Sequence, residues 1–114
     1  MLATLMGLKS ISCRDVSNLL PQQRVVVVDV NARARWTDAH VPGARNLDPV
    51  RFGEADLPAG KHTELVFYCA NFLCAKAPTA ARRAKAMGYS NVRVMSAGIQ
   101  GWLAERLPVE TSEN

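Results

Sequence analysis

The stretch Leu65-Val66-Phe67-Tyr68-Cys69 and the segment from Pro78 to Gly88 decide the fold of this chain. The first is an apolar run with aromatic and β-branched members, which is typical of a strand that is covered on both faces. The second predicts a helix, because proline suits a first helical turn and glycine suits the left-handed residue after a helix end. Together they predict a buried strand, a short loop and a helix.

The predicted helix has one face of small side chains that can lie close to a sheet. This face consists of Ala80, Ala81, Ala84 and Met87. Basic side chains occupy the opposite face, where their charge is favourable near the negative end of the helix dipole.

Cys69 is expected to end the strand, so that the following loop leads into the N-terminus of the helix. Free backbone N–H groups at such a place lower the pKa of a thiol and offer a cradle for an anion. Cys69 is therefore the candidate catalytic nucleophile, and the residues of the loop are candidates for substrate binding. These residues are Ala70, Asn71, Phe72, Leu73, Cys74, Ala75 and Lys76.

The rest of the chain alternates between strand and helix patterns. Strands are expected over residues 25–30, 44–47 and 92–94, helices over residues 13–20, 33–39 and 99–105, and a loop with one helical turn over residues 48–61. This alternation predicts an α/β fold with a mostly parallel sheet and helices on both faces. Ligands of such sheets bind at the carboxyl ends of the strands, where Asp29 and Cys69 are both expected.

Length and charge narrow the class of protein. The 114 residues suit one domain with a core that needs neither disulfides nor metal. No stretch has the apolar length that spans a bilayer, and residues 1–8 are interpreted as an N-terminal strand or arm, so we expect a cytoplasmic protein without membrane contact.

The net charge of +4 favours a small anionic substrate. The basic residues are scattered and not interleaved with aromatics, which argues against a nucleic-acid partner.

Three cysteines in a chain without a secretory signal argue against a disulfide framework. The cysteines and the two histidines do not have zinc-ligand spacing, so no metal site is expected. Cys13 is assigned to an early helix, where a structural role is favoured over a redox role.

Three blocks of sequence carry a resemblance. They are residues 29–44 (DVNARARWTDAHVPGA), residues 65–92 with Tyr68-Cys69, Ala80-Ala81 and Gly88-Tyr89, and residues 98–110 with Gly101-Trp102 and Leu107-Pro108-Val109-Glu110. In this order the blocks resemble a rhodanese-like sulfurtransferase domain, and they cover nearly the whole chain. The resemblance implies one rhodanese-like domain over residues 1–114, with a three-layer fold.

The resemblance also implies an activity. The Cys69 thiolate would attack the outer sulfur of a small anionic donor such as thiosulfate and become a persulfide. A thiol or cyanide-like acceptor, or a protein acceptor, would then take that sulfur. Such a covalent intermediate predicts ping-pong kinetics and requires no cofactor.

This chain departs from the family pattern around the loop. Many members carry glycine and then Arg-Ser before the Ala-Ala helix, whereas this loop is longer and carries Phe72, Leu73 and Cys74. Lys76 is the nearby cation, and it either orients an anion as a point charge or is a solvated side chain. Asn31 and Arg35 replace a common Arg and Glu. The apolar loop predicts a pocket mouth that suits a larger thiol or protein donor better than thiosulfate.

Cys74 has two interpretations. It is a loop thiol packed against the sheet, or it attacks a Cys69 persulfide and leaves a disulfide, which would make the domain a thiol-redox module.

Two further functions compete with sulfur transfer. A dual-specificity phosphatase of the cell-cycle type shares this fold, but its chemistry needs an arginine at the position of Ala75, which counts against it. A non-catalytic partner-binding module is the other, and the presence of Cys69 argues against that.

Four other residues invite functional interpretations that we set against structural ones. Asp29 and His40 could act as acid or base, but hydrogen-bonding roles in the strand end and the turn are favoured. Trp36 and Trp102 are expected to be packing residues.

Overall fold

The computed structural model describes residues 7–112, so most of the N-terminal arm expected over residues 1–8 lies outside the described part. The elements, with η for a 3₁₀ helix, are β1 (Lys9–Ser10), α2 (Cys13–Leu19), η1 (Leu20–Gln22), β2 (Val25–Asp29), α3 (Arg33–Asp38), β3 (Arg45–Asn46), η2 (Glu54–Asp56), β4 (Glu64–Tyr68), α4 (Lys76–Ala86), β5 (Val92–Val94) and α5 (Gly98–Ala104).

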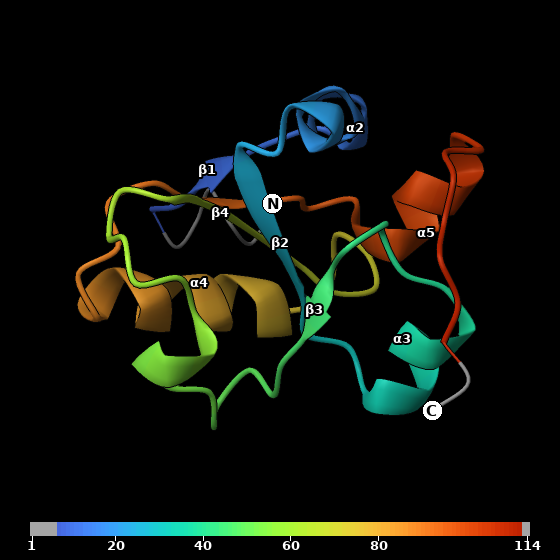
Figure 1. Cartoon of the computed structure of the whole chain (residues 1–114). Coiled ribbons are helices and arrows are strands. Elements are labelled where there is room, and N and C mark those ends of the chain that lie inside the picture. Colours follow the sequence, from blue (N-terminus) through green and yellow to red (C-terminus); the bar gives the residue numbers. More distant parts are fainter. Residues whose placement is uncertain (1–6, 113–114) are drawn as a thin grey trace.

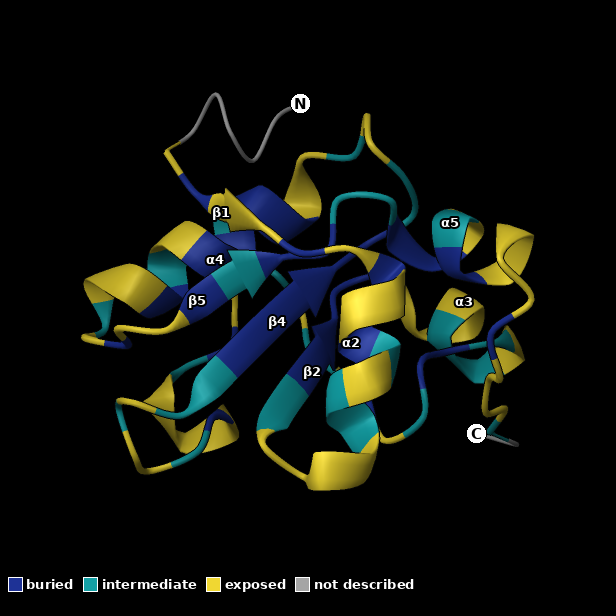
Figure 2. Cartoon of the chain, turned by 90° about the horizontal axis from the view of Figure 1, so that it is seen from above, coloured by how far each residue is buried: buried dark blue, intermediate teal, exposed yellow. Residues whose placement is uncertain are grey.

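The strands form one sheet in the order β1-β5-β4-β2-β3, and every neighbouring pair is parallel. The central pair, β2 and β4, runs in register from Val25 opposite Glu64 to Asp29 opposite Tyr68. Both strands therefore end at the same edge, on the side of the molecule where α3 and α5 lie (Figure 2). The prediction of an α/β fold with a mostly parallel sheet is confirmed.

Helices cover both faces of the sheet, with α4 on one side and α2 on the other (Figure 1). Successive side chains of a strand point to opposite faces, and this alternation divides the core in two. Phe67 packs in the cluster that contains the alanine face of α4. Val66 and Tyr68 pack in the cluster that contains Val16 of α2 and Trp102 of α5.

The predicted elements are present, with small differences at their ends. Strand β4 ends at Tyr68, so Cys69 is the first residue after the strand and not its last. Helix α4 begins at Lys76, before Pro78, because the first helical turn tolerates a missing N–H anywhere within it. Gly88 follows this helix with φ +101°, the left-handed conformation expected of it.

A buried hydrogen-bond network joins the ends of the two central strands. The Tyr68 hydroxyl donates to Asp29 Oδ2 at 2.6 Å and accepts from the Val41 amide at 3.1 Å. Asp29 Oδ1 accepts from the Asn31 amide at 2.8 Å. Burial raises the pKa of the Asp29 carboxyl, although the hydrogen bonds from Tyr68 and Asn31 act to lower it. Asp29 thus has the hydrogen-bonding role that we favoured.

His40 and the tryptophans also have structural positions. His40 Nδ1 donates to the Trp36 carbonyl at 2.6 Å, and the two rings stack with centroids 4.2 Å apart. Trp102 is fully buried, and its indole N–H donates to the Pro108 carbonyl at 2.9 Å. Within residues 7–112, none of the helices has the length and apolar character needed to cross a bilayer.

We predict that Tyr68→Phe lowers the free energy of unfolding by about 2–3 kcal/mol, because it leaves a buried carboxylate and a buried amide without their shared partner. Tyr89→Phe is the control, since the Tyr89 hydroxyl donates to the neutral carbonyl of Pro58 alone, and it should cost about 1 kcal/mol. Urea unfolding of both variants checks this, and equal losses would contradict it.

Candidate active site

The end of β4 and the start of α5 hold the backbone around Cys69 in place. The amides of Ile99 and Gln100 donate to the carbonyls of Cys69 and Ala70, each at 3.0 Å. Because α5 lies against the carbonyl side of this segment, the thiol side is left to face the loop and the first turn of α4. Cys69 itself is 3% exposed.

This close approach depends on Gly98. The residue has φ +65°, and a Cβ built there would lie 2.5 Å from the carbonyl of Ala70 and 2.6 Å from that of Cys69. Any side chain would displace the backbone that carries the thiol.

Asn71 shapes the loop between Cys69 and α4. Its side-chain oxygen accepts from the Leu73 amide at 2.9 Å, and its backbone carbonyl accepts from the Cys74 amide at 3.2 Å. Its side-chain amide also donates to Gln100 Oε1 at 3.3 Å, which ties the loop to α5. The turn brings Cys74 back beside the start of the loop, where the Cys69 Sγ donates to the Cys74 carbonyl at 3.6 Å.

The expectation that the helix N-terminus lowers the pKa of Cys69 is wrong for the resting site. Burial, followed by the hydrogen bond with the Cys74 side chain, raises the pKa of the Cys69 thiol to about 12. The backbone amides of Ala77 and Ala70 do act on the thiol in the lowering direction, as expected. Their effect is smaller than the cost of burying a thiolate.

At Cys74, the effects that lower the pKa of the thiol exceed the effect of burial. Burial acts to raise its pKa, but this thiol is only half-buried, and the hydrogen bond with Cys69 and the amides of Lys76 and Ala70 outweigh burial. The positive charge of Lys76 adds to them, so the pKa of Cys74 is lowered from its ordinary value. The site thus pairs a buried neutral thiol with a more accessible and more acidic one.

The two thiols share a small cavity. Its volume is about 10 Å³, close to the space that one water molecule needs. It is lined by Cys69, Asn71, Phe72, Cys74, Ala77, Pro78, Val94, Met95 and Ser96.

Only some of the loop residues that are candidates for substrate binding line the cavity. Asn71, Phe72 and Cys74 line the cavity with Cys69, whereas Leu73 is 86% exposed and is not part of the lining. Ala70 acts through its backbone amide, and Ala75 is exposed.

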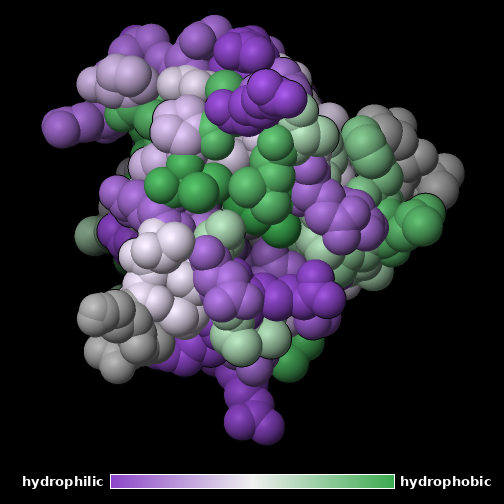
Figure 3. Space-filling view, turned by 90° about the vertical axis from the view of Figure 1, so that its right-hand side faces the viewer, coloured by the Kyte–Doolittle hydropathy of each residue, from purple (hydrophilic) through white to green (hydrophobic). Residues whose placement is uncertain are grey.

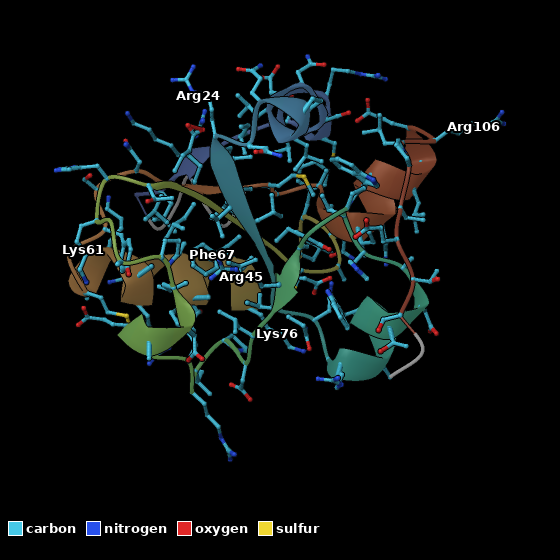
Figure 4. The ribbon with its side chains drawn as sticks, viewed as in Figure 1. Arg24, Arg45, Lys61, Phe67, Lys76 and Arg106 are labelled. Carbon is cyan, nitrogen blue, oxygen red and sulfur yellow. The ribbon has the colours of Figure 1, made fainter. Side chains whose placement is uncertain are left out.

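Lys76 does not line the thiol cavity. It lies at the end of α4 nearest β3 (Figure 4), on a separate open groove of about 430 Å³ that the ends of β2 and β3 also line. Its charge still acts on Cys74, as the smallest of the effects that lower the pKa of that thiol.

Figure 3 views the face at the carboxyl ends of the strands, where hydrophobic atoms gather centrally among hydrophilic ones. Phe72 is 51% exposed and Leu73 is 86% exposed, so the loop presents two large apolar side chains to solvent. Residues 7–112 contain no cluster of three or more side chains that could hold a metal ion.

Sequence reasoning missed the site residues that follow β5, the strand paired with β4. Met95 and Ser96 follow β5 and line the cavity, Gln100 holds Asn71, and Gly98 permits the close approach. Gly98 stands in one of the blocks that carry the family resemblance, but its steric role depends on a contact between segments distant in sequence.

We predict that iodoacetamide labels Cys74 about 10-fold faster than Cys69 at about pH 8, because alkylation follows the thiolate fraction and access. Fragment-ion mass spectrometry after brief labelling locates the modified residue. Cys13 serves as an internal control, since burial raises its pKa to about 11 and it should also react slowly. Preferential labelling of Cys69 would contradict this description of the pair.

We predict that Gly98→Ala lowers the free energy of unfolding by about 2 kcal/mol and increases alkylation of Cys69, because the new methyl group displaces the loop backbone. Gly53→Ala is the matched control, since its φ is negative and a Cβ there meets nothing within 4 Å. Thermal unfolding and labelling of both variants test this. Similar behaviour of the two would rule out the steric role of Gly98.

Comparisons with known proteins bear on this geometry. The chain is 29% identical to arsenate reductase 2.2 of Oryza sativa subsp. japonica over 116 aligned residues, which covers 90% of this chain and 88% of that protein. Among solved structures, a protein from Bacillus halodurans superposes with a TM-score of 0.82 at 24% identity, covering 90% of this chain and 77% of that one.

A thiosulfate sulfurtransferase from Pseudomonas aeruginosa superposes with a TM-score of 0.81 at 25% identity, covering 94% of this chain and 20% of that one. The rhodanese-like domain of an Anabaena protein does so with a TM-score of 0.76 at 19% identity, over 90% of this chain and 78% of that one. The sequence signature of the Rhodanese-like domain matches residues 12–105. This match spans most of the described residues, and the chain therefore belongs to the rhodanese-like domain family.

Proposed function

We propose that this protein is a sulfurtransferase that carries sulfane sulfur as a persulfide of Cys69. The observation that supports this most directly is the position of the Cys69 thiol, which faces the amides of Ala70 and Ala77 beside a cavity of about one atom's size. A likeness to a thiosulfate sulfurtransferase agrees with it.

The first half-reaction loads the enzyme. Cys69 gives up its proton to solvent, and its sulfur forms a bond with the outer sulfur of the donor. The bond between that outer sulfur and the remainder of the donor breaks, and the remainder leaves with the bonding electron pair. The amides of Ala70 and Ala77 offset part of the burial cost of the thiolate and then stabilise the persulfide anion. The raised pKa of Cys69 favours the neutral thiol in the empty site.

The second half-reaction passes the sulfur on. The thiolate or cyanide of an acceptor attacks the outer persulfide sulfur, and Cys69 leaves as a thiolate. The exposed side chains of Phe72 and Leu73 flank this site, which favours donors and acceptors with an apolar part. We therefore include persulfides of larger thiols, and of proteins, among the substrates.

Oxyanion chemistry is the weaker alternative. The name of the rice relative raises arsenate reduction, and the fold is shared with phosphatases. A tetrahedral oxyanion needs several strong donors around it, and this loop has an alanine at position 75 in place of the arginine that would supply them. A non-catalytic binding role would leave the placement of Cys69 unexplained.

We predict that wild-type protein turns over thiosulfate or a low-molecular-weight persulfide with cyanide as acceptor, and that Cys69→Ala reduces the turnover at least ~100-fold, since the covalent carrier is gone. Thiocyanate production measures the rate. Cys13→Ala is the control, because its thiol faces the Gly98 carbonyl and should be dispensable. Turnover that survives in Cys69→Ala would refute the proposed function.

A further inference from the structure

A second thiol in the catalytic loop has no task in simple sulfur transfer. Cys74 lines the same cavity as Cys69, and the Cys69 thiol donates to the Cys74 carbonyl at 3.6 Å. Cys13, by comparison, lies in α2 and faces the Gly98 carbonyl at 4.0 Å.

We propose that Cys74 resolves the Cys69 persulfide, so that the loop works as a dithiol that reduces sulfane sulfur to hydrosulfide. This inference rests on the proposed function, because it needs a persulfide on Cys69. It changes the product from a sulfurated acceptor to free hydrosulfide, and it identifies an external dithiol as the second substrate.

The cavity is the first argument for this step. With a volume of about 10 Å³, it can receive the outer sulfur of a persulfide but not the side chain of an incoming acceptor. An external thiol has to arrive from solution, whereas Cys74 is already part of the cavity wall. An attacking group held in place reacts with a large advantage over one that must arrive from solution.

The loop backbone is the second argument. The turn at Asn71 returns the chain so that the Cys74 carbonyl lies 3.6 Å from the Cys69 Sγ. Asn71 is itself held by its bonds to Leu73 and Gln100, so the approach of Cys74 is built into the loop. The lowered pKa of Cys74 supports the same role, since a thiolate is the attacking species.

The step balances without an added oxidant. The Cys74 thiolate attacks the Sγ of Cys69, a Cys69–Cys74 disulfide bond forms, and the bond to the outer sulfur breaks. The outer sulfur leaves with the electron pair as hydrosulfide, so the sulfane sulfur is reduced by two electrons while the two thiols are oxidised. An external dithiol then reduces the disulfide, and the half-exposed Cys74 is the sulfur that it can reach.

The test is a single turnover under argon. Fully reduced wild-type protein, Cys74→Ser, Cys69→Ala and Cys13→Ala are each mixed with excess glutathione persulfide, separated from it, and quenched with N-ethylmaleimide. Intact-mass and fragment-ion spectra then identify persulfide and disulfide. In a parallel unquenched sample that receives one equivalent of the persulfide, a colorimetric assay measures the hydrosulfide released from the moment of mixing.

We expect wild type and Cys13→Ala to release about one hydrosulfide per loaded chain and to contain a Cys69–Cys74 disulfide. Cys74→Ser should keep its added sulfur on Cys69 and release hydrosulfide at least ~10-fold more slowly. Cys69→Ala should form neither product. Thermal unfolding of Cys74→Ser checks that the variant is folded.

Two results would overturn the inference in different ways. If wild type keeps a stable persulfide as Cys74→Ser does, with no disulfide, then Cys74 does not resolve it, while the proposed sulfur transfer stands. If neither wild type nor the folded Cys74→Ser takes up sulfur on Cys69, both the inference and the proposed function fail.

Discussion

The site depends on the two hydrogen bonds by which the start of α5 holds the carbonyls of Cys69 and Ala70. They fix the direction in which the chain leaves β4, and with it the side toward which the thiol points. The contact is close enough to require a glycine at position 98, with its left-handed φ. These two hydrogen bonds therefore help to hold the loop after β4 in the conformation in which its amides face Cys69.

Burial and backbone polarity oppose each other at Cys69. Burial raises the pKa of the thiol, and the amides of Ala70 and Ala77 recover part of that cost. The proposed persulfide would face the same amides, which would offset part of the cost of its buried charge. Cys74 and Lys76 occupy the wetter side of the same loop, where a thiolate is easier to form.

Much of the fold is readable from local patterns. The apolar run before Cys69, the alanine face of α4 and the glycine after it each act through short-range sterics and burial, and each has its expected conformation. The errors lie at element ends, where a strand or helix can gain or lose a residue at little cost. The position of Cys69 directly after a buried strand could likewise be predicted, because it follows from the same pattern.

The raised pKa of Cys69 could not be predicted from local sequence patterns. Its direction depends on how completely the loop, α4 and the residues after β5 enclose the thiol, and burial of this kind arises only when distant segments pack together. The same is true of Met95, Ser96 and Gln100, whose places in the site follow from the parallel pairing of β4 with β5.

The sequence by itself determined the order of strands and helices, the family, and the presence of two thiols in one loop, because these follow from residue type and spacing. Only the tertiary structure decided which thiol is buried and which is acidic, and how little room lies between them. The physical reason is that desolvation and enclosure are properties of the packed molecule, to which every neighbouring element contributes.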